Sequence, residues 1–531
     1  MAPLLIAGLM AILVSPAHAI PAFARKYQTS CTTCHTDFPR LNDFGKAFKD
    51  AGFKFPKEDE TFIKIPPVLL GAEAQKQLWP NTVWPGQIDG LPPIGLRMNS
   101  FFQLTSRNRS KFNSLADPSA IAPFIPRTDF QSGLFSIFTA GNFGSDIAFW
   151  VDDDISVGGD NANGGLGDGY LKFVNVGRFF HLPKDALSLR AGQFELDLPF
   201  TQARGINLSP YDIYSQASIG AMNSEFAQQN VANSFSFAGA APGVDLSGGH
   251  MYGGYHYSLA VVNQNTSGSG PNGSPFVPSA NGVGFTSDSN FKDLYGRVMY
   301  RWNLERNQES RNAIQAAGST GPRDHTYLAI GGYSFYGRAV NRLLAVDGSS
   351  TNVILTAREP FYRVGGDFDF NYHALEVYGL YMYGHDHNLI PVDNTGAPVP
   401  LPVEPLPALQ PVAFSRGQPA TFGGGFVQAN YLAKPWMLVI IRWDAVNSPE
   451  DRINCLAAST DTPFPVPFNS TRNRFTPGVQ FLIHANIKAS FEYQFRPQQA
   501  VVVETDPKTG LPVARKPFRT NTAVAGLEFV Y

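Results

Sequence analysis

The sequence predicts an all-β fold: a 16-stranded antiparallel β-barrel of the outer-membrane type that follows a small, mostly helical N-terminal domain. Three observations predict it. After residue 93, apolar and polar residues alternate along segments long enough for tilted membrane strands. Short and long connections alternate between those segments. Beyond the N-terminus, no stretch has the ~20 apolar residues that a membrane-spanning helix needs.

Composition agrees with a barrel. Charged residues make up 16% of the 531-residue chain, below the ~25% that is usual for soluble domains. The 50 Gly and 41 Pro suit many strands separated by turns and loops. The net charge of −2 does not indicate nucleic acid as a partner. The partner that the composition predicts is membrane lipid.

The first element is an export signal. An apolar run from Pro3 to Val14 is followed by the small-x-small sequence Ala17-His18-Ala19, the pattern of a signal-peptide cleavage site. The run is too short to cross a bilayer as a helix. We expect residues 1–19 to be a signal peptide and the mature chain to start at Ile20.

The next element contains the motif Cys31-Thr32-Thr33-Cys34-His35. C-x-x-C-H marks c-type haem attachment, because the two thiols reach the two vinyl groups of one porphyrin and the histidine binds the iron. A redox C-x-x-C pair would not require the histidine, and a zinc site would need a second ligand pair, whereas Cys455 is alone. The motif predicts one covalently bound haem c, with His35 as axial ligand of the haem iron.

The sixth iron ligand is left open. Residues 20–97 contain no Met, and His35 is their one His. The nearest Met is Met98. Three arrangements remain: five-coordinate iron, a ligand from the barrel, or a lysine of the N-terminal domain. The lysine candidates are Lys46, Lys49 and Lys54.

Residues 20–56 form the N-terminal domain, in which Asn42 is expected to cap a helix that runs through Lys49 and ends at Gly52. Spaced aromatic residues supply apolar surface to cover a haem, or simply to pack a small domain. They are Phe23, Phe38, Phe44, Phe48 and Phe53, together with Leu41.

This domain resembles a known family. The segments that carry the resemblance are Pro21-Ala22-Phe23-Ala24-Arg25, the haem motif, Phe38-Pro39-x-Leu41, Phe44-Gly45-x-x-Phe48 and Gly52-Phe53. They are similar to the outer-membrane fused monohaem cytochrome–porin family of iron-oxidising bacteria. The resemblance implies a c-type cytochrome domain that plugs or underlies a 16-strand porin, and Fe(II) oxidation at the cell surface. It also implies that Cys31, Cys34 and His35 hold the haem.

A proline-containing connector, residues 57–93, leads to the barrel, residues 94–531. Residues 487–496 show the clearest alternation, with apolar side chains at odd positions and polar ones at even positions. The predicted strands are 94–107, 132–142, 144–154, 167–176, 186–195, 233–249, 253–263, 292–304, 325–337, 360–370, 372–384, 420–431, 435–446, 473–484, 486–496 and 519–531.

The connections predict an orientation. Those after even-numbered strands are mostly tight, and those after odd-numbered strands are mostly long, such as 196–232, 264–291, 385–419 and 447–472. Residues 305–324 depart from this rule. In outer-membrane barrels the short turns are periplasmic and the long loops extracellular. We therefore expect the haem domain at the periplasmic end and the protein in the bacterial outer membrane.

Strand parity sorts the candidate ligands. Met98 and Met437 are predicted to face lipid, because charged or polar neighbours take the lumen positions. Met299, Met382, His256 and His484 are predicted to face inward. His256 and His484 lie near the periplasmic end and are candidate distal haem ligands. The alternative for each is an ordinary polar residue of the lumen wall.

Two further groups are candidate sites for an external Fe(II) ion. Asp152, Asp153 and Asp154 end the third strand, and carboxylates attract hard divalent cations. His385 and His387 open a long extracellular loop and offer imidazole ligands. The alternative for the aspartates is a solvated loop entrance.

Three functions follow from this reading. The first is electron transfer from an extracellular donor, Fe(II) by the resemblance, through the haem to a periplasmic c-type cytochrome or another carrier. Because the hydrocarbon band is ~25 Å tall, the haem domain should insert into the lumen or electrons must hop through a relay. The second is a porin or uptake channel with a haem sensor or gate. The third is an enzyme with an open iron site, such as a peroxidase.

Overall fold

The structure is a computed structural model. It describes residues 22–37, 39–55, 59–64, 68–69, 77–78, 80–81, 87–88, 94–105, 128–144, 146–156, 165–201, 206–215, 240–263, 291–304, 326–347, 350–387, 389–392, 394–396, 413–416, 420–447, 471–484, 486–495, 502–505, 512–515 and 521–530. The predicted signal peptide and much of the connector lie outside these residues.

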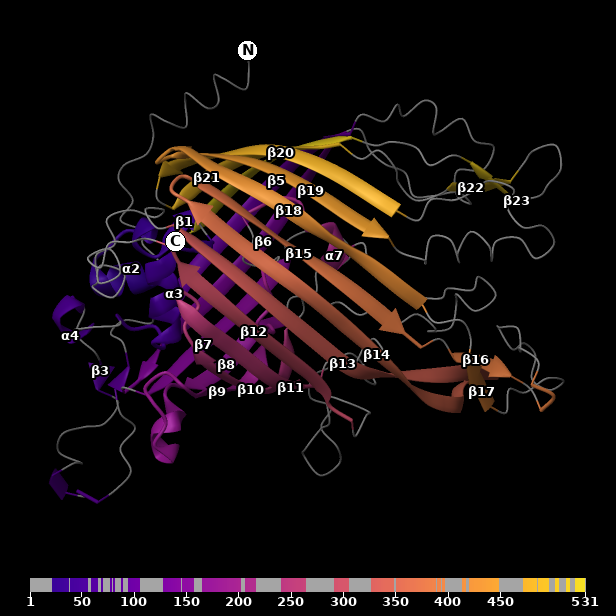
Figure 1. Cartoon of the computed structure of the whole chain (residues 1–531), viewed down its shortest axis with the longest axis horizontal. Coiled ribbons are helices and arrows are strands. Elements are labelled where there is room, and N and C mark those ends of the chain that lie inside the picture. Colours follow the sequence, from indigo (N-terminus) through magenta and orange to yellow (C-terminus); the bar gives the residue numbers. More distant parts are fainter. Residues whose placement is uncertain are drawn as a thin grey trace, which may run out of the picture.

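Sixteen antiparallel strands form a closed barrel (Figure 1). Each strand pairs with its neighbour in sequence, and the last strand closes on the first through pairs such as Val530↔Arg97. The strands are β5 (Ile94–Thr105), β6 (Thr128–Phe143), β7 (Ile147–Ser156), β8 (Gly165–Phe173), β9 (Ser188–Phe194), β10 (Ala241–Gly249), β11 (Gly254–Val262), β12 (Asp293–Asn303), β13 (Tyr327–Asp347), β14 (Ser350–Tyr372), β15 (Leu375–Asp386), β18 (Ala420–Lys434), β19 (Met437–Asn447), β20 (Thr471–His484), β21 (Ile487–Gln494) and β24 (Thr522–Val530). The predicted barrel and its strand number are confirmed.

Some strands differ from the prediction in length. The pairing of β13 with β14 continues to Asp347↔Ser350, so residues 338–359 form a two-stranded ribbon where the predicted strands stop. The ribbon is rich in Val, Leu, Ile and Thr, which favour extended backbone. Two more hairpins lie within the long connections: β16 (Leu389–Val392) with β17 (Ala413–Arg416), and β22 (Val502–Thr505) with β23 (Pro512–Arg515).

The barrel wall separates apolar from polar side chains. On β12, Arg297, Met299 and Arg301 are buried in the interior, whereas Val298 and Tyr300 face outward. An apolar outer surface and a polar interior are what a strand in lipid requires. The same alternation confirms that Met98 faces outward, and that Met299, Met382 and His256 face inward.

The inward position predicted for His484 is wrong. A register shift lies between Leu482 and His484, and His484 is exposed beside the turn that joins β20 to β21. The alternation of inward and outward side chains along β20 is interrupted there, because an extra residue reverses the face of the residues that follow.

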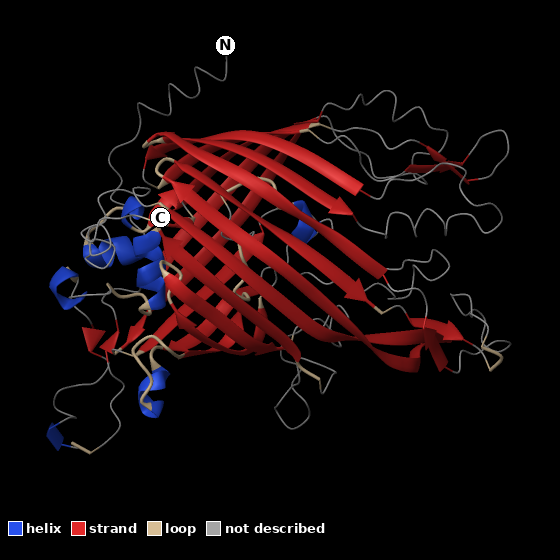
Figure 2. Cartoon of the chain, viewed as in Figure 1, coloured by secondary structure: helices blue, strands red, loops and turns tan. Residues whose placement is uncertain are grey.

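The N-terminal segment, residues 22–55, lies at the short-turn end of the barrel, where Figure 2 shows its helices. Its elements are α2 (Ala22–Tyr27), η1 (Cys31–Thr33), β1 (His35–Asp37), β2 (Arg40–Leu41) and α3 (Asp43–Asp50), and α4 (Asp59–Phe62) follows, with the small β3 (Val68–Leu69) and β4 (Gln87–Ile88) in the connector. Its aromatic core continues into the barrel wall, because Phe48 and Phe53 belong to one buried cluster with Ala140 and Ala148. No helix among the described residues is long and apolar enough to span a membrane.

A second segment enters the lumen from the other end. Residues 195–201 and 206–215, here called the lumen strap, follow β9 and include α7 (Asp212–Ser215), which lies inside the barrel in Figure 2. The long connection that the sequence predicts over 196–232 is present, but its described residues fold into the lumen instead of projecting outward as an extracellular loop.

The strap is held by the wall opposite its origin. Glu492 of β21 accepts hydrogen bonds from Leu208 N at 2.6 Å and from Ser209 N at 3.1 Å. Arg442 of β19 donates to Ser209 O at 3.0 Å. Arg474 of β20 pairs with Asp212 at 3.0 Å. The strap therefore pairs with buried charges of the wall and is held against it. An unpaired charge there would lower the free energy of unfolding.

Replacing Glu492 by Gln tests this anchor. The amide keeps the shape but loses the charge that three donors of the strap share, including Ser209 Oγ at 2.5 Å. A hydrogen bond to a charged group contributes about 1.5–3 kcal/mol, so we expect faster hydrogen exchange at residues 206–215. Glu528→Gln, which loses pairs only with Arg97 and Lys488 of the wall, is the matched control. Equal exchange in both variants would contradict the anchor.

Candidate functional site

The C-x-x-C-H motif lies on a tight turn. Residues 31–33 form η1, in which Thr33 N donates to Ser30 O at 3.0 Å and Cys34 N donates to Cys31 O at 3.2 Å. The turn brings the two cysteines close in space without joining them, since both thiols are free. Burial raises the pKa of the Cys34 thiol to about 12, so it is uncharged at neutral pH.

The orientation of His35 suits an iron ligand. Its Nδ1 lies 3.1 Å from Pro39 O. A carbonyl oxygen can only accept, so Nδ1 carries the proton and the lone pair of the neutral ring is on Nε2. Burial lowers the pKa of His35 to about 4, which keeps the ring neutral. A histidine that binds a metal through one nitrogen commonly donates the other N–H to a carbonyl in this way.

The N-terminus of α3 holds the motif in place. Asn42 Oδ1 accepts from Gly45 N at 2.9 Å, which confirms Asn42 as the predicted helix cap. Asn42 also reaches back to the motif, because Nδ2 donates to Thr33 O at 3.0 Å and its backbone N donates to Cys34 O at 2.9 Å. Gly45 allows this contact, since a Cβ there would collide with Cys34 O.

Of the aromatic residues predicted to cover a haem, Phe38 lies outside the described residues and the others pack in one aromatic cluster. Phe23 stacks on Phe53 with centroids 5.3 Å apart, and Tyr27 stacks on Phe55 at 4.1 Å. Cys34 packs against the same cluster. Two free thiols and an oriented neutral imidazole are the donor set of c-type haem attachment, so the residues fit that group.

Ion pairs fix the N-terminal segment in the mouth of the barrel. Arg40 lies 2.5 Å from Glu376 of β15 and 3.4 Å from Asp369 of β14. On the same part of the wall, Arg301 of β12 makes two bonds to Asp43, at 2.7 and 2.6 Å. These wall residues face the lumen. The N-terminal segment thus enters the mouth of the barrel, which is one of the two arrangements that the electron-transfer hypothesis allows, the other being a relay.

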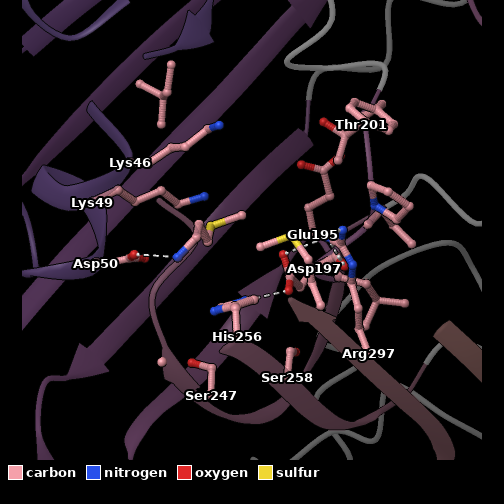
Figure 3. Close-up of a pocket in the computed structure, with 18 of the residues that line it drawn as sticks. Lys46, Lys49, Asp50, Glu195, Asp197, Thr201, Ser247, His256, Ser258 and Arg297 are labelled. Atoms are coloured by element: carbon pink, nitrogen blue, oxygen red, sulfur yellow. Dashed lines mark hydrogen bonds and ion pairs between the residues drawn. The ribbon is translucent and has the colours of Figure 1, made fainter. Parts of the chain in front are cut away.

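A cavity of about 250 Å³ lies between α3, the lumen strap and the wall (Figure 3). We call it the lumen chamber. His256 Nε2 is 2.8 Å from Asp197 of the strap, which also lies 3.6 Å from Arg297. Arg297 in turn pairs with Asp367 at 2.9 Å. The lining therefore carries both signs of charge, arranged as a paired network.

The chamber gathers some of the candidate distal ligands. Lys46, Lys49 and His256 all line it, but its lining does not include Lys54 or the exposed His484. His256 makes the bond expected of an ordinary polar residue of the lumen, through the nitrogen that faces Asp197. A distal-ligand role for it stays a prediction.

Asp152 and Asp153, the two aspartates of β7 whose side chains the structure describes, do not share one site. Asp152 accepts from the backbone N of Asp168. Asp153 is paired across the sheet with Ile137, whose side chain is on the outer face, and alternation separates it from Asp152. Of the side chain of Asp154 nothing is described.

The two histidines of the other candidate site are neighbours. The rings of His385 and His387 have centroids 4.9 Å apart, and His385 also stacks on Tyr362 at 5.0 Å. Within the described part of the chain, no three His, Cys, Asp or Glu side chains gather into a metal-binding group. An Fe(II) site at either place stays a prediction.

Comparisons with known proteins add little beyond the barrel. No protein-family profile and no curated protein matches the chain. Among solved structures, it is similar to OmpT of Vibrio cholerae, with 9% identity, a TM-score of 0.40 and coverage of 85% of this chain and 99% of that one. It is also similar to the outer-membrane channel DcaP of Acinetobacter baumannii, with 10% identity, a TM-score of 0.42 and coverage of 84% and 97%.

At these scores the architecture rests on the strand pairing of this chain. A closed barrel of sixteen antiparallel strands, apolar outside and polar inside, is the fold of a bacterial outer-membrane protein. The protein is therefore located in the outer membrane, with lipid against its outer face.

Asn42→Ala tests how α3 supports the motif. The variant loses the helix cap, at about 1 kcal/mol, and the bond to Thr33 O. We expect hydrogen exchange to rise at residues 43–50 and at the motif. In Asn42→Asp the carboxylate still caps α3 but cannot donate to Thr33 O, so exchange should rise at the motif alone. Equal behaviour of both variants would contradict the two separate roles.

Proposed function

We propose that this outer-membrane protein transfers electrons through one haem c bonded to Cys31 and Cys34, with His35 as axial ligand. The observation that carries the proposal is the C-x-x-C-H motif held inside the mouth of a closed barrel. When bound, the haem supplies reversible one-electron exchange at its iron. The chain supplies the attachment, the orientation of His35 through Pro39 O, and a fixed position at the membrane.

The ion pairs that hold the N-terminal segment in the barrel mouth support electron transfer, because they fix the position of the segment that carries the haem motif. Arg301 is fully buried and holds Asp43 through two bonds, and Arg40 bridges two carboxylates of the wall. Electron transfer depends on a short, constant distance between donor and acceptor. A cytochrome domain fixed by buried ion pairs meets that need from the periplasmic mouth of the barrel, where a periplasmic c-type cytochrome or another carrier has access.

The donor that we propose is extracellular Fe(II), on the resemblance of residues 21–53 to the cytochrome–porin family of iron oxidisers. The candidate sites at Asp152–Asp154 and at His385 and His387 belong to this proposal. They are testable one at a time, because one lies on β7 and the other at and just beyond the end of β15.

A second function, a porin or uptake channel with a haem sensor or gate, is favoured by the charged lumen chamber. It lies between the N-terminal segment and the strap, and its lining of paired acids and bases resembles an aqueous path more than an apolar core. In this reading the N-terminal segment blocks the pore until its ion pairs are released.

The first test is haem attachment. In Cys31→Ser/Cys34→Ser we expect the purified protein to lose a haem-sized mass increment and all haem absorbance, because both thioether bonds are gone. The barrel itself should persist as a heat-modifiable band. In the parent protein, Fe(II) should reduce the haem in stopped-flow measurements. Haem that stays oxidised would exclude Fe(II) as donor, and a parent protein without the mass increment would exclude the proposal.

Conductance distinguishes the second function. In planar bilayers the parent protein should conduct weakly, because the N-terminal segment fills the mouth. Removing one partner of a buried ion pair costs about 3–5 kcal/mol, so Arg40→Gln/Arg301→Gln should raise the open probability. The matched control is Arg178→Gln, whose partner Asp146, at 2.8 Å, lies in a turn outside the lumen. A parent conductance already equal to that of the double variant would contradict a blocked mouth.

A further inference from the structure

The connection between β8 and β9, residues 174–187, carries an exposed apolar and basic segment. It contains η2 (Val176–Phe180), and every residue from Arg178 to Lys184 is exposed. Phe179 and Phe180 are each 69% exposed, and Leu182 is 45% exposed. The same stretch contains Arg178, His181 and Lys184 but no acidic residue. Large apolar side chains exposed side by side indicate an interaction surface.

The connection folds back over the outer face of the barrel. Tyr257 faces outward on β11, because His256 and Ser258 on either side of it are buried inside. Its hydroxyl donates to Ala186 O at 2.8 Å. Gly248 of β10 is on the same outward face as Leu246, yet it is buried. A Cβ at this position would collide with Ala186 O. The segment therefore lies against the surface that faces lipid.

Hydrogen bonds make this projection rigid. Gly177 N donates to Leu187 O at 3.2 Å, and Leu182 N donates to Gly177 O at 3.0 Å. Gly249 N donates to Asp185 O at 2.9 Å, which ties the connection to the next turn of the barrel. The phenylalanines are held outward by this frame, so they are not free to fold onto the chain.

The residues around Phe179 and Phe180 indicate that these two side chains contact lipid. Tyr255, Tyr300 and Trp302 are outward-facing aromatic residues at the same end of neighbouring strands, each 44–54% exposed. Aromatic residues at strand ends form the girdle at the boundary between lipid and water. Figure 1 shows the magenta η2 segment beyond the outline of the barrel, at the end where the short turns lie. Basic residues beside aromatic ones match anionic phosphates beside acyl chains.

We propose that residues 178–184 anchor the barrel in the periplasmic leaflet of the outer membrane. Phe179, Phe180 and Leu182 insert at the boundary between headgroups and acyl chains, and Lys184 faces the phosphates, whereas Arg178 is already paired with Asp146 at 2.8 Å. The occupant is the phospholipid surface rather than a periplasmic protein. This inference does not depend on the haem.

Photocrosslinking tests the occupant. Phe180 is replaced by p-benzoylphenylalanine in the full-length protein, in cells and in vesicles of phosphatidylethanolamine and phosphatidylglycerol. Val298, 63% exposed on the lipid face, is the positive control, and Leu78, 68% exposed in the connector, is the comparison position. We expect lipid adducts at position 180 several times above those at position 78. A protein adduct at 180 in cells, or lipid yields equal to those at 78, would overturn the proposal.

Fluorescence gives a second measurement. The emission of Phe180→Trp minus that of the parent protein isolates the new indole in the same vesicles. We expect it to be blue-shifted and quenched by lipids brominated near the headgroup. Quenching by aqueous iodide, with emission typical of indole in water, would show that the segment projects into the periplasm and would refute the anchor.

Discussion

Charge pairing inside a closed lumen is the constraint on which the rest of this structure depends. A barrel in lipid must turn its polar residues inward, and this one turns in Arg297, Arg301, Arg442 and Arg474, all buried. An unpaired buried charge is costly. The wall supplies part of the pairing by itself, as in Arg442 with Asp444 at 2.9 Å. Segments that are not part of the wall supply the rest.

Two such segments meet the wall from opposite ends. Asp43 of the N-terminal segment pairs with Arg301, and Asp212 of the lumen strap pairs with Arg474. Both pairs have a donor with almost no exposure to solvent. The same interaction that satisfies the wall therefore positions the two segments, and the lumen chamber is the space that they leave between them. An electron or a solute that moves along the barrel axis therefore passes both segments.

The outer face follows a different rule. There the solvent is lipid, the outward-facing residues of strands such as β12 are uncharged, and aromatic residues collect near the ends. The connection at residues 174–187 extends this pattern beyond the strands. Hydrogen bonds from Tyr257 and Gly249 hold its backbone, and its exposed phenylalanines and Lys184 match the chemistry of the membrane boundary.

The residues of the candidate site could largely be predicted from the local sequence. Cys31, Cys34 and His35 are adjacent, and Asn42 caps α3 where the sequence predicts. Relations between distant residues were not readable. That Cys34 O would collide with a side chain at Gly45, that Pro39 orients His35, and that His256 meets Asp197 depend on how the chain folds back on itself. His484 was misplaced because one irregularity in β20 reverses the count of faces.

The sequence by itself determined the barrel: alternation with a period of two selects strands, and the alternation of short and long connections selects an even-numbered, up-and-down wall. It also predicted the attachment of a haem at Cys31, Cys34 and His35. Tertiary structure alone decided that residues 195–201 and 206–215 lie in the lumen and that the N-terminal segment enters it. The reason is physical, since these placements depend on ion pairs such as Asp43 with Arg301 and Asp212 with Arg474, whose partners are hundreds of residues apart and leave no local pattern.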